Sequence, residues 1–240
     1  MIIDAHCHPQ LSEFHKLYLE TWKEHCLFAA STDLIDFKYL EELQTKHLWL
    51  QTSVGIHPWK LGSTFPTEEL KLIETLLQSA PKPLGECGLD FSLKYKINAQ
   101  LQSAVLENFF IMATKFQVPI ILHCVKAHHE ILRLLKSYPK QKILLHGFHG
   151  SIDLVQQYLR YDCYFGISIS KLERLPSIIP IQRLLLESDG LVPVSDFKIA
   201  YERLSQIKDF SFIKMEKQLE SNYQRLLIQG TVRNNNKKIL

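Results

Sequence analysis

The chain has 240 residues, and 46% of them are hydrophobic, which is enough to bury a large core. Its 28 Lys and Arg residues against 25 Asp and Glu residues give a formal charge of +3, which permits an anionic substrate without indicating one. A secretory signal pattern and an apolar run near the ~20 residues that span a bilayer are both absent, which predicts a cytoplasmic protein without a membrane partner. Five scattered cysteines without CxxC spacing indicate reduced thiols.

Short apolar segments with the composition of buried strands recur along the chain. The first four span residues 1–5, 26–30, 48–55 and 82–87. The second four span residues 119–124, 142–147, 163–168 and 184–188. Between them lie amphipathic segments with apolar residues three and four apart, which predict helices at residues 37–48, 67–80 and 98–116.

The alternation of strands and helices predicts an α/β fold. Eight such units with nearly continuous apolar strands favour a (β/α)8 TIM barrel, regular or distorted, with a parallel sheet and outer helices, over an open doubly wound sheet. No linker or repeat divides the chain, so we expect one domain over residues 1–229. Residues 230–240 contain three asparagines and two lysines, which predicts a flexible C-terminal tail.

Polar residues stand at the carboxyl ends of these strands, which converge on one face of such a barrel. They are His6, His8, His57, Glu86, His123, His146 and Asp189. His6 and His8 alternate along their strand and therefore project on the same side. Imidazole suits zinc, manganese, iron and nickel, and carboxylate also suits magnesium and manganese, so the set predicts a metal site. A carboxylate such as Glu86 can bridge two ions.

Seven short motifs together resemble one known family. DAHCH, GIHP, GECGLD, PIILH, HGFHG, LLLESDG and NYQRLL occur in an order similar to that of the TatD family of metal-dependent deoxyribonucleases, within the amidohydrolase-like barrels, from Met1 to about Leu227. The resemblance implies two divalent metal ions, which are Mg, Mn or Zn. One ion would be held by His6, His8, Glu86 and Asp189, and the other by Glu86, His123 and His146.

The resemblance also implies a reaction, the hydrolysis of phosphodiester bonds at an end of single-stranded DNA or RNA by a metal-activated water. Asp189 would accept the proton of that water and Glu86 would be its catalytic partner, while His57 would face the substrate. Lys94 and Tyr95 follow the strand at residues 82–87, and Tyr95 is a candidate for stacking on a base. A solvated loop is the alternative for both.

Two departures from the family pattern concern the substrate. Val125 stands where the family usually has arginine, and the neighbouring Lys126 offers phosphate a point charge without the planar fork of arginine. Gly190 after Asp189 predicts a loosened loop over the site.

Glu187 shares the strand parity of Asp189, so we expect it to point into the barrel and support a ligand.

Two other functions remain open from the sequence. The same activated water would attack an amide or ester, such as a D-aminoacyl ester or a cyclic amide. However, Glu86 occupies the place where many barrels of this superfamily carry a modified lysine, which favours the nuclease. A non-catalytic, metal-dependent nucleic-acid binder is the third reading, motivated by Val125 and the altered loop. A monomer is the default expectation, since the sequence does not determine the oligomeric state.

Overall fold

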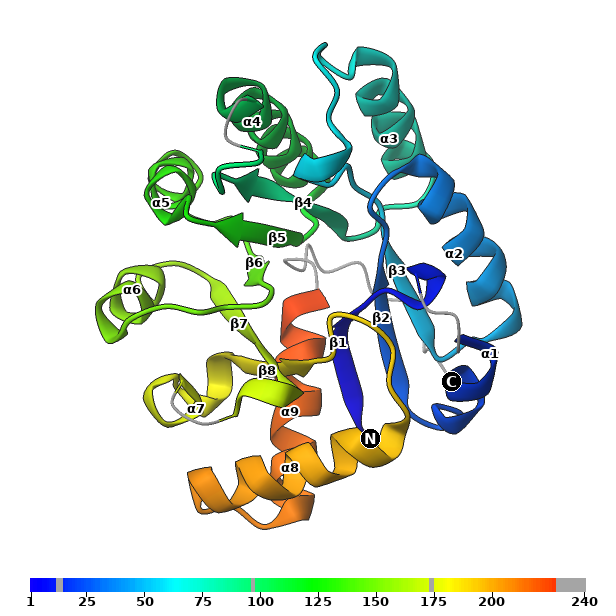
Figure 1. The fold of residues 1–240 in the computed structure, drawn as a ribbon, viewed down its shortest axis with the longest axis vertical. Helices are drawn as coiled ribbons and strands as arrows, with labels where there is room; N and C mark the ends of the chain where they lie inside the picture. The colour runs from blue at the N-terminus through cyan, green and yellow to red at the C-terminus, as the bar shows by residue number, and fades with distance from the viewer. Residues whose placement is uncertain (12–14, 96–97, 173–174, 228–240) are drawn as a thin grey trace, which may run out of the picture.

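The computed structural model describes residues 1–11, 15–95, 98–172 and 175–227, in which helices surround a set of parallel strands (Figure 1). The strands are β1 (Ile3–Cys7), β2 (Cys26–Ala30), β3 (Leu50–Ser53), β4 (Leu84–Asp90), β5 (Ile120–Val125), β6 (Ile143–Leu145), β7 (Cys163–Ser168) and β8 (Leu184–Glu187). The helices are α1 (His15–Thr21), α2 (Leu34–Lys46), α3 (Thr67–Ser79), α4 (Ala99–Phe116), α5 (His128–Ser137), α6 (Ile152–Tyr158), α7 (Leu175–Ile178), α8 (Val194–Lys208) and α9 (Phe212–Leu227). Within these ranges no helix has the length and apolar character needed to cross a membrane.

The strands close into a barrel through two seams. One hydrogen-bonded segment runs β1-β2-β3 and the other runs from β4 to β8 in order, and an isolated parallel bridge joins the residue after β3 to the first residue of β4. At the second seam, where the end of β8 meets the end of β1, Asp189 N donates to His6 O (3.1 Å) and His8 N donates to Gly190 O (2.7 Å). The (β/α)8 barrel expected from the alternating elements is the observed fold.

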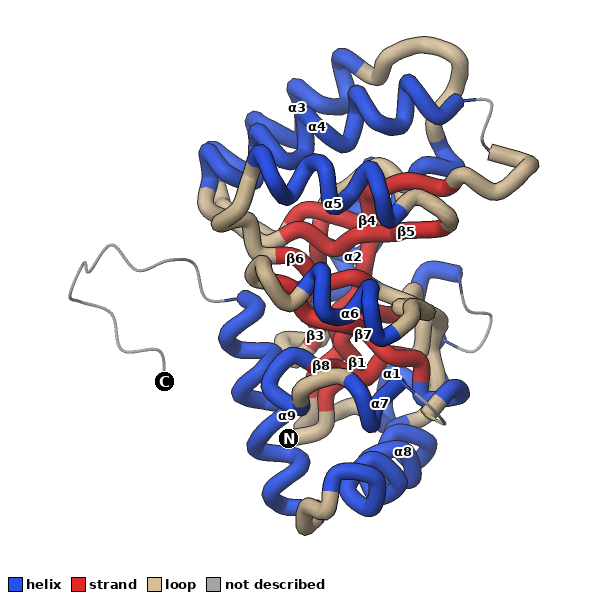
Figure 2. Tube along the Cα trace, turned by 90° about the vertical axis from the view of Figure 1, so that its left-hand side faces the viewer, coloured by secondary structure: helices blue, strands red, loops and turns tan. Residues whose placement is uncertain are grey.

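Apolar side chains fill two layers. Inside the barrel, Phe28, Ile121 and Leu185 belong to one cluster that includes Tyr223 of α9, and a larger cluster lies between the strands and the outer helices. Asn222 of α9 donates to the backbone oxygens of Ile181, just before β8, and of Leu184, its first residue, which places this helix at the amino-terminal end of the barrel (Figure 2). The carboxyl-terminal end is left for the polar residues.

Most predicted elements begin or end one to three residues away from their bounds in the structure, and two of these differences have a local cause. α2 begins at Leu34 rather than residue 37, because the Asp33 side chain accepts hydrogen bonds from two backbone N–H groups of the first turn and caps the helix. β4 continues to Asp90, so Glu86 is its third residue and not its last. Its two glycines interrupt the apolar pattern, which concealed the second half of the strand. The predicted tail at residues 230–240 lies outside the described residues.

Those glycines allow β4 to lie against β5. Gly85 and Gly88 have φ values of +134° and +148°, which side chains with a Cβ rarely adopt. A Cβ at either position would overlap the backbone of β5, at Ile121 and His123 respectively. The two glycines therefore bring the intervening Glu86 next to the strand that carries His123.

The buried amide of Asn222 gives a prediction about stability. Its Nδ2 donates to Ile181 O (2.6 Å) and Leu184 O (2.8 Å), so Asn222→Ala removes the donor for two carbonyls in the closed end of the barrel. We expect this variant to lose about 2–3 kcal/mol of unfolding free energy in urea titrations. The exposed Gln224 of the same helix is the control, since Gln224→Ala should cost less than about 0.5 kcal/mol. Equal losses in the two variants would contradict this role of Asn222.

Candidate metal centre

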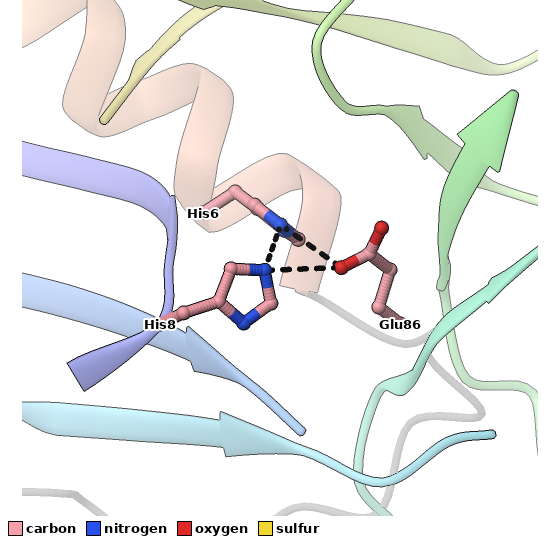
Figure 3. Close-up of side chains that lie close together, drawn as sticks. All are labelled: His6, His8 and Glu86. Atoms are coloured by element: carbon pink, nitrogen blue, oxygen red, sulfur yellow. Dashed lines mark hydrogen bonds and ion pairs between the residues drawn. The ribbon is translucent and has the colours of Figure 1, made fainter. Parts of the chain in front are cut away.

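His6 of β1 and His8, which directly follows the strand, face the barrel interior because the strand changes register. Its pairing with β2 shifts between Asp4 and Cys7, as at a β-bulge. After the shift Cys7 packs in the cluster on the helix side, while the Nε2 atoms of His6 and His8 lie 3.1 Å apart (Figure 3). The two imidazoles thus converge on one point, as their alternation in the sequence predicted.

Glu86 divides its two carboxylate oxygens between two pairs of histidines. Oε2 lies 3.3 Å from His6 Nε2 and 3.1 Å from His8 Nε2 (Figure 3). Oε1 lies 3.0 Å from His123 Nδ1 and 2.8 Å from His146 Nε2, and these two nitrogens are 3.1 Å apart. The side chain of Glu86 is only 2% exposed. One buried carboxylate therefore joins two clusters of ligand atoms.

Asp189 lies on the solvent side of the first cluster, which His6, His8 and Glu86 Oε2 form. Its Oδ1 is 3.7 Å from His6 Nε2 and 3.6 Å from His8 Nε2, and its side chain is 51% exposed. The loop around it is hydrogen-bonded, since Gly190 N donates to Ser188 Oγ (3.3 Å) in addition to the seam with β1. The left-handed residue is Asp189 itself, with φ 57°, and the loosened loop expected from Gly190 stays a prediction.

Burial and the neighbouring charges set the protonation of the cluster. Burial, together with the proximity of His146, lowers the pKa of His6 to about 3. Burial alone would raise the pKa of Glu86, but the imidazoles of His146 and His6 hold it well below its usual range. At neutral pH the centre therefore combines an ionised carboxylate with a neutral His6, and both present lone pairs.

The hydrogen bonds of His8 suit a metal ligand. Its Nδ1 donates to Ala30 O (2.9 Å), so a cation held against Glu86 Oε2, which lies 3.1 Å from His8 Nε2, would meet the lone pair of the neutral ring. Ligand atoms about 2.1 Å from a tetrahedral ion lie about 3.4 Å apart, close to the separations found here. The buried histidine and glutamate clusters are therefore consistent with divalent metal binding.

His57 has the opposite tautomer. Trp59 N donates to His57 Nδ1 (3.1 Å), so the proton of the neutral ring is on Nε2, which donates to Glu86 Oε1 (3.2 Å). His57, Glu86 and His123 are close enough to hold an ion. With its proton on Nε2, however, His57 serves as a hydrogen-bond donor to Glu86, and its expected role toward the substrate stays a prediction.

Asp90 is a site residue that the sequence analysis missed. Its Oδ2 lies 3.5 Å from His123 Nε2 and accepts the indole N–H of Trp59 at 2.6 Å. The side chain of Gln102 accepts from Asp90 N (2.7 Å) and donates to Asp90 O (3.2 Å). Asp90 shares strand parity with Glu86, and that signal would have revealed it had β4 been extended to residue 90.

Glu187 points into the barrel, as its strand parity predicted. It is buried, its Oε1 accepts from Gly147 N (2.5 Å), and it lies 3.6 Å from His146 Nδ1. A Cβ on Gly166 of β7 would overlap Glu187 Oε2, so the glycine leaves space for this carboxylate. Glu187 can therefore orient the ring of His146.

The other residues predicted to bind substrate lie farther out. Lys126 is exposed directly after β5, with φ 55°. Lys94 lies in the loop after β4 with its Nζ 4.8 Å from the ring centroid of Tyr95, and that ring stacks on Trp59. Trp59 connects this loop to the metal centre and was not singled out in the sequence.

The tautomers predict different effects of two matched substitutions. Asparagine at position 8 or 57 can replace the Nδ1 hydrogen bond of histidine but has no atom in place of Nε2. We expect His8→Asn to weaken zinc binding by at least about 10-fold, because it removes a lone pair from the first cluster.

His57→Asn should change zinc affinity by less than about twofold, since its Nε2 carries a proton. Metal content after dialysis against a series of free zinc concentrations would measure both variants, with circular dichroism as the control for folding. An equal loss of zinc in both proteins would show that His57 is a ligand.

Relatives of the chain are recognised from its sequence. The profile of the TatD-related DNase family matches residues 3–228. The 3'-5' ssDNA/RNA exonuclease TatD of Klebsiella pneumoniae is 31% identical over 179 residues, which cover 69% of this chain and 66% of that protein. The 3'-5' RNA nuclease TATDN2 of Homo sapiens is 25% identical over 215 residues, which cover 78% of this chain and 28% of that protein. The matches thus span less than two thirds of either relative.

Solved structures share the fold. The TatD homologue YJJV from Escherichia coli superposes with a TM-score of 0.83 at 20% identity, over 94% of this chain and 97% of that one. A TatD family hydrolase from Entamoeba histolytica gives a TM-score of 0.78 at 19% identity, over 94% and 97% of the two chains. With a family profile that matches from β1 to the end of α9, the chain belongs to the TatD-related DNase family.

Proposed function

We propose that the protein is a metal-dependent 3'-5' exonuclease for single-stranded DNA and RNA. The observation that carries the proposal is the division of Glu86 between two histidine pairs, with Oε2 toward His6 and His8 and Oε1 toward His123 and His146. The bacterial relatives named as 3'-5' ssDNA/RNA exonucleases support the substrate class and the direction of cleavage.

We assign one divalent ion to His6, His8, Glu86 and Asp189, and a second to Glu86, His123 and His146. Mg, Mn and Zn all suit this mixture of imidazole and carboxylate. When bound, such ions neutralise the charge of a phosphodiester and lower the pKa of water. This local charge explains how a chain with a formal charge of only +3 can act on a polyanion.

The protein's own groups then have distinct roles. Asp189 is half exposed beside His6 and His8, so its carboxylate can accept the proton of a water that approaches from the mouth of the barrel. Glu86 is held as an anion between the two histidine pairs and keeps both clusters in place. His57 donates its Nε2 proton to Glu86 Oε1 and so helps to hold that carboxylate, and we assign it to the substrate side of the centre.

Residues around the carboxyl-terminal mouth of the barrel would bind the substrate. Lys94 and Lys126 are exposed and supply positive charge on the loops after β4 and β5. Because Val125 has no hydrogen-bonding side chain, phosphate contact at β5 depends on Lys126 as a point charge. Tyr95 adds an aromatic ring beside Lys94.

Cleavage of end-labelled oligonucleotides tests this proposal. Protein loaded with Mg, Mn or Zn should shorten single-stranded DNA and RNA stepwise from the 3' end, and EDTA should stop the reaction. We expect Asp189→Asn to lower kcat by about 100-fold or more, because the proton acceptor is lost.

The exposed Asp153 of α6 supplies the matched control, since Asp153→Asn should retain wild-type kcat. Absence of cleavage in metal-loaded protein, with turnover of a D-aminoacyl ester or a cyclic amide, would replace the nuclease by a carbonyl hydrolase. Tight binding of oligonucleotides without any turnover would make the protein a metal-dependent binder.

A further inference from the structure

We propose that Trp59 is the platform on which the 3'-terminal base of the substrate stacks, an inference that rests on the proposed exonuclease function. Trp59 is 53% exposed, although large aromatic side chains are usually buried. Its ring centroid lies 5.6 Å from that of His123 and 4.7 Å from that of His57. An exposed indole therefore stands directly beside the centre at which the phosphate would bind.

The indole is held in place before any ligand arrives. Its Nε1 donates to Asp90 Oδ2 (2.6 Å), and the backbone N of the same residue donates to His57 Nδ1 (3.1 Å). The polar atom of the ring is thus satisfied within the protein, and what remains exposed is apolar aromatic surface. A fixed ring loses little conformational freedom when a base stacks on it.

Tyr95 supports Trp59 from the neighbouring loop. The two rings stack with centroids 5.2 Å apart and an interplanar angle of 17°, and Lys94 Nζ lies 4.8 Å from the Tyr95 centroid. Asn98 Nδ2 also donates to Gly62 O (3.3 Å), which links the loop after β4 to the loop after β3. Tyr95 therefore packs behind Trp59 and supports it. The base stacking that the sequence suggested for Tyr95 is assigned to Trp59.

A nucleobase is the ligand that fits this surface. Every base has a π face, so an aromatic platform accepts single strands of any sequence, whereas paired bases in a duplex are not available to it. The platform lies next to His57 and His123, which places the stacked base close to the phosphate that the metal centre would hold. Stacking would thus position the terminal nucleotide for cleavage and favour single strands.

An abasic substrate tests the platform. Two oligonucleotides would be compared, identical except that the 3'-terminal residue of one lacks its base. We expect the wild-type protein to show a KM about 10-fold higher for the abasic substrate. Trp59→Leu, which keeps an apolar side chain but no π face, should have similar KM values for both. Trp59→Phe should retain most of the discrimination.

The comparison between the two substrates separates stacking from structural damage. A loss of order in the metal centre of a Trp59 variant would lower kcat on both substrates and leave the KM ratio unchanged. Equal wild-type KM values for the two substrates would overturn the platform while leaving the nuclease intact. Persistence of the wild-type ratio in Trp59→Leu would also overturn it.

Fluorescence gives a readout without catalysis. The chain has three tryptophans; Trp22 is 0% exposed, Trp49 is partly buried, and Trp59 is exposed. Short oligo(dT) with cleavage-resistant phosphorothioate linkages, added to the metal-loaded protein, should quench the emission, and Trp59→Phe should abolish the quenching. Quenching in a protein that cleaves no nucleic acid would retain the platform and reject the exonuclease. Absence of quenching in the wild type would reject the platform, whatever the activity.

Discussion

The negative charge of Glu86 is buried in the carboxyl-terminal end of the barrel, and much of the structure around it compensates for that burial. An isolated carboxylate in such a place would be costly, so it needs partners that approach it closely. Five imidazoles provide these contacts, at 2.8 to 3.3 Å, and they come from His6, His8, His57, His123 and His146. The barrel brings these segments together, and glycines on both sides of Glu86 let β4 approach β5 closely enough for the contacts to form.

The hydrogen bonds around the imidazoles determine what each ring can do. His8 gives its Nδ1 proton to a backbone oxygen and turns a lone pair toward Glu86, whereas His57 accepts a backbone N–H and turns a proton toward the same carboxylate. Two rings of identical chemistry thus become a proposed metal ligand and a hydrogen-bond donor. Asp90 and Glu187 stand behind His123 and His146 in the way that carboxylates orient metal-binding histidines.

The same network reaches toward the substrate. Asp90 contacts both His123 and the indole of Trp59, so the residue that would orient His123 as a proposed ligand also fixes the exposed indole beside it. This arrangement couples the two parts of the proposed reaction, because the base and the phosphate of one nucleotide would be held by side chains that share a partner. Lys94 and Lys126 each add one positive charge at the rim of the barrel. The strongest positive charge of the proposed binding surface would be that of the metal ions.

The sequence by itself determined the barrel and the convergence of His6, His8, Glu86, His123, His146 and Asp189. Strand and helix patterns are local, and the closure of parallel strands places their carboxyl ends together without further information. The tertiary structure decided the extent of β4, the tautomers of His8 and His57, and the stack of Trp59 on Tyr95. These features depend on hydrogen bonds and ring contacts between segments far apart in the chain, such as Trp59 with Asp90 and His8 with Ala30. Such contacts leave no periodic signal in a single sequence, because they arise only when the folded barrel brings the segments together.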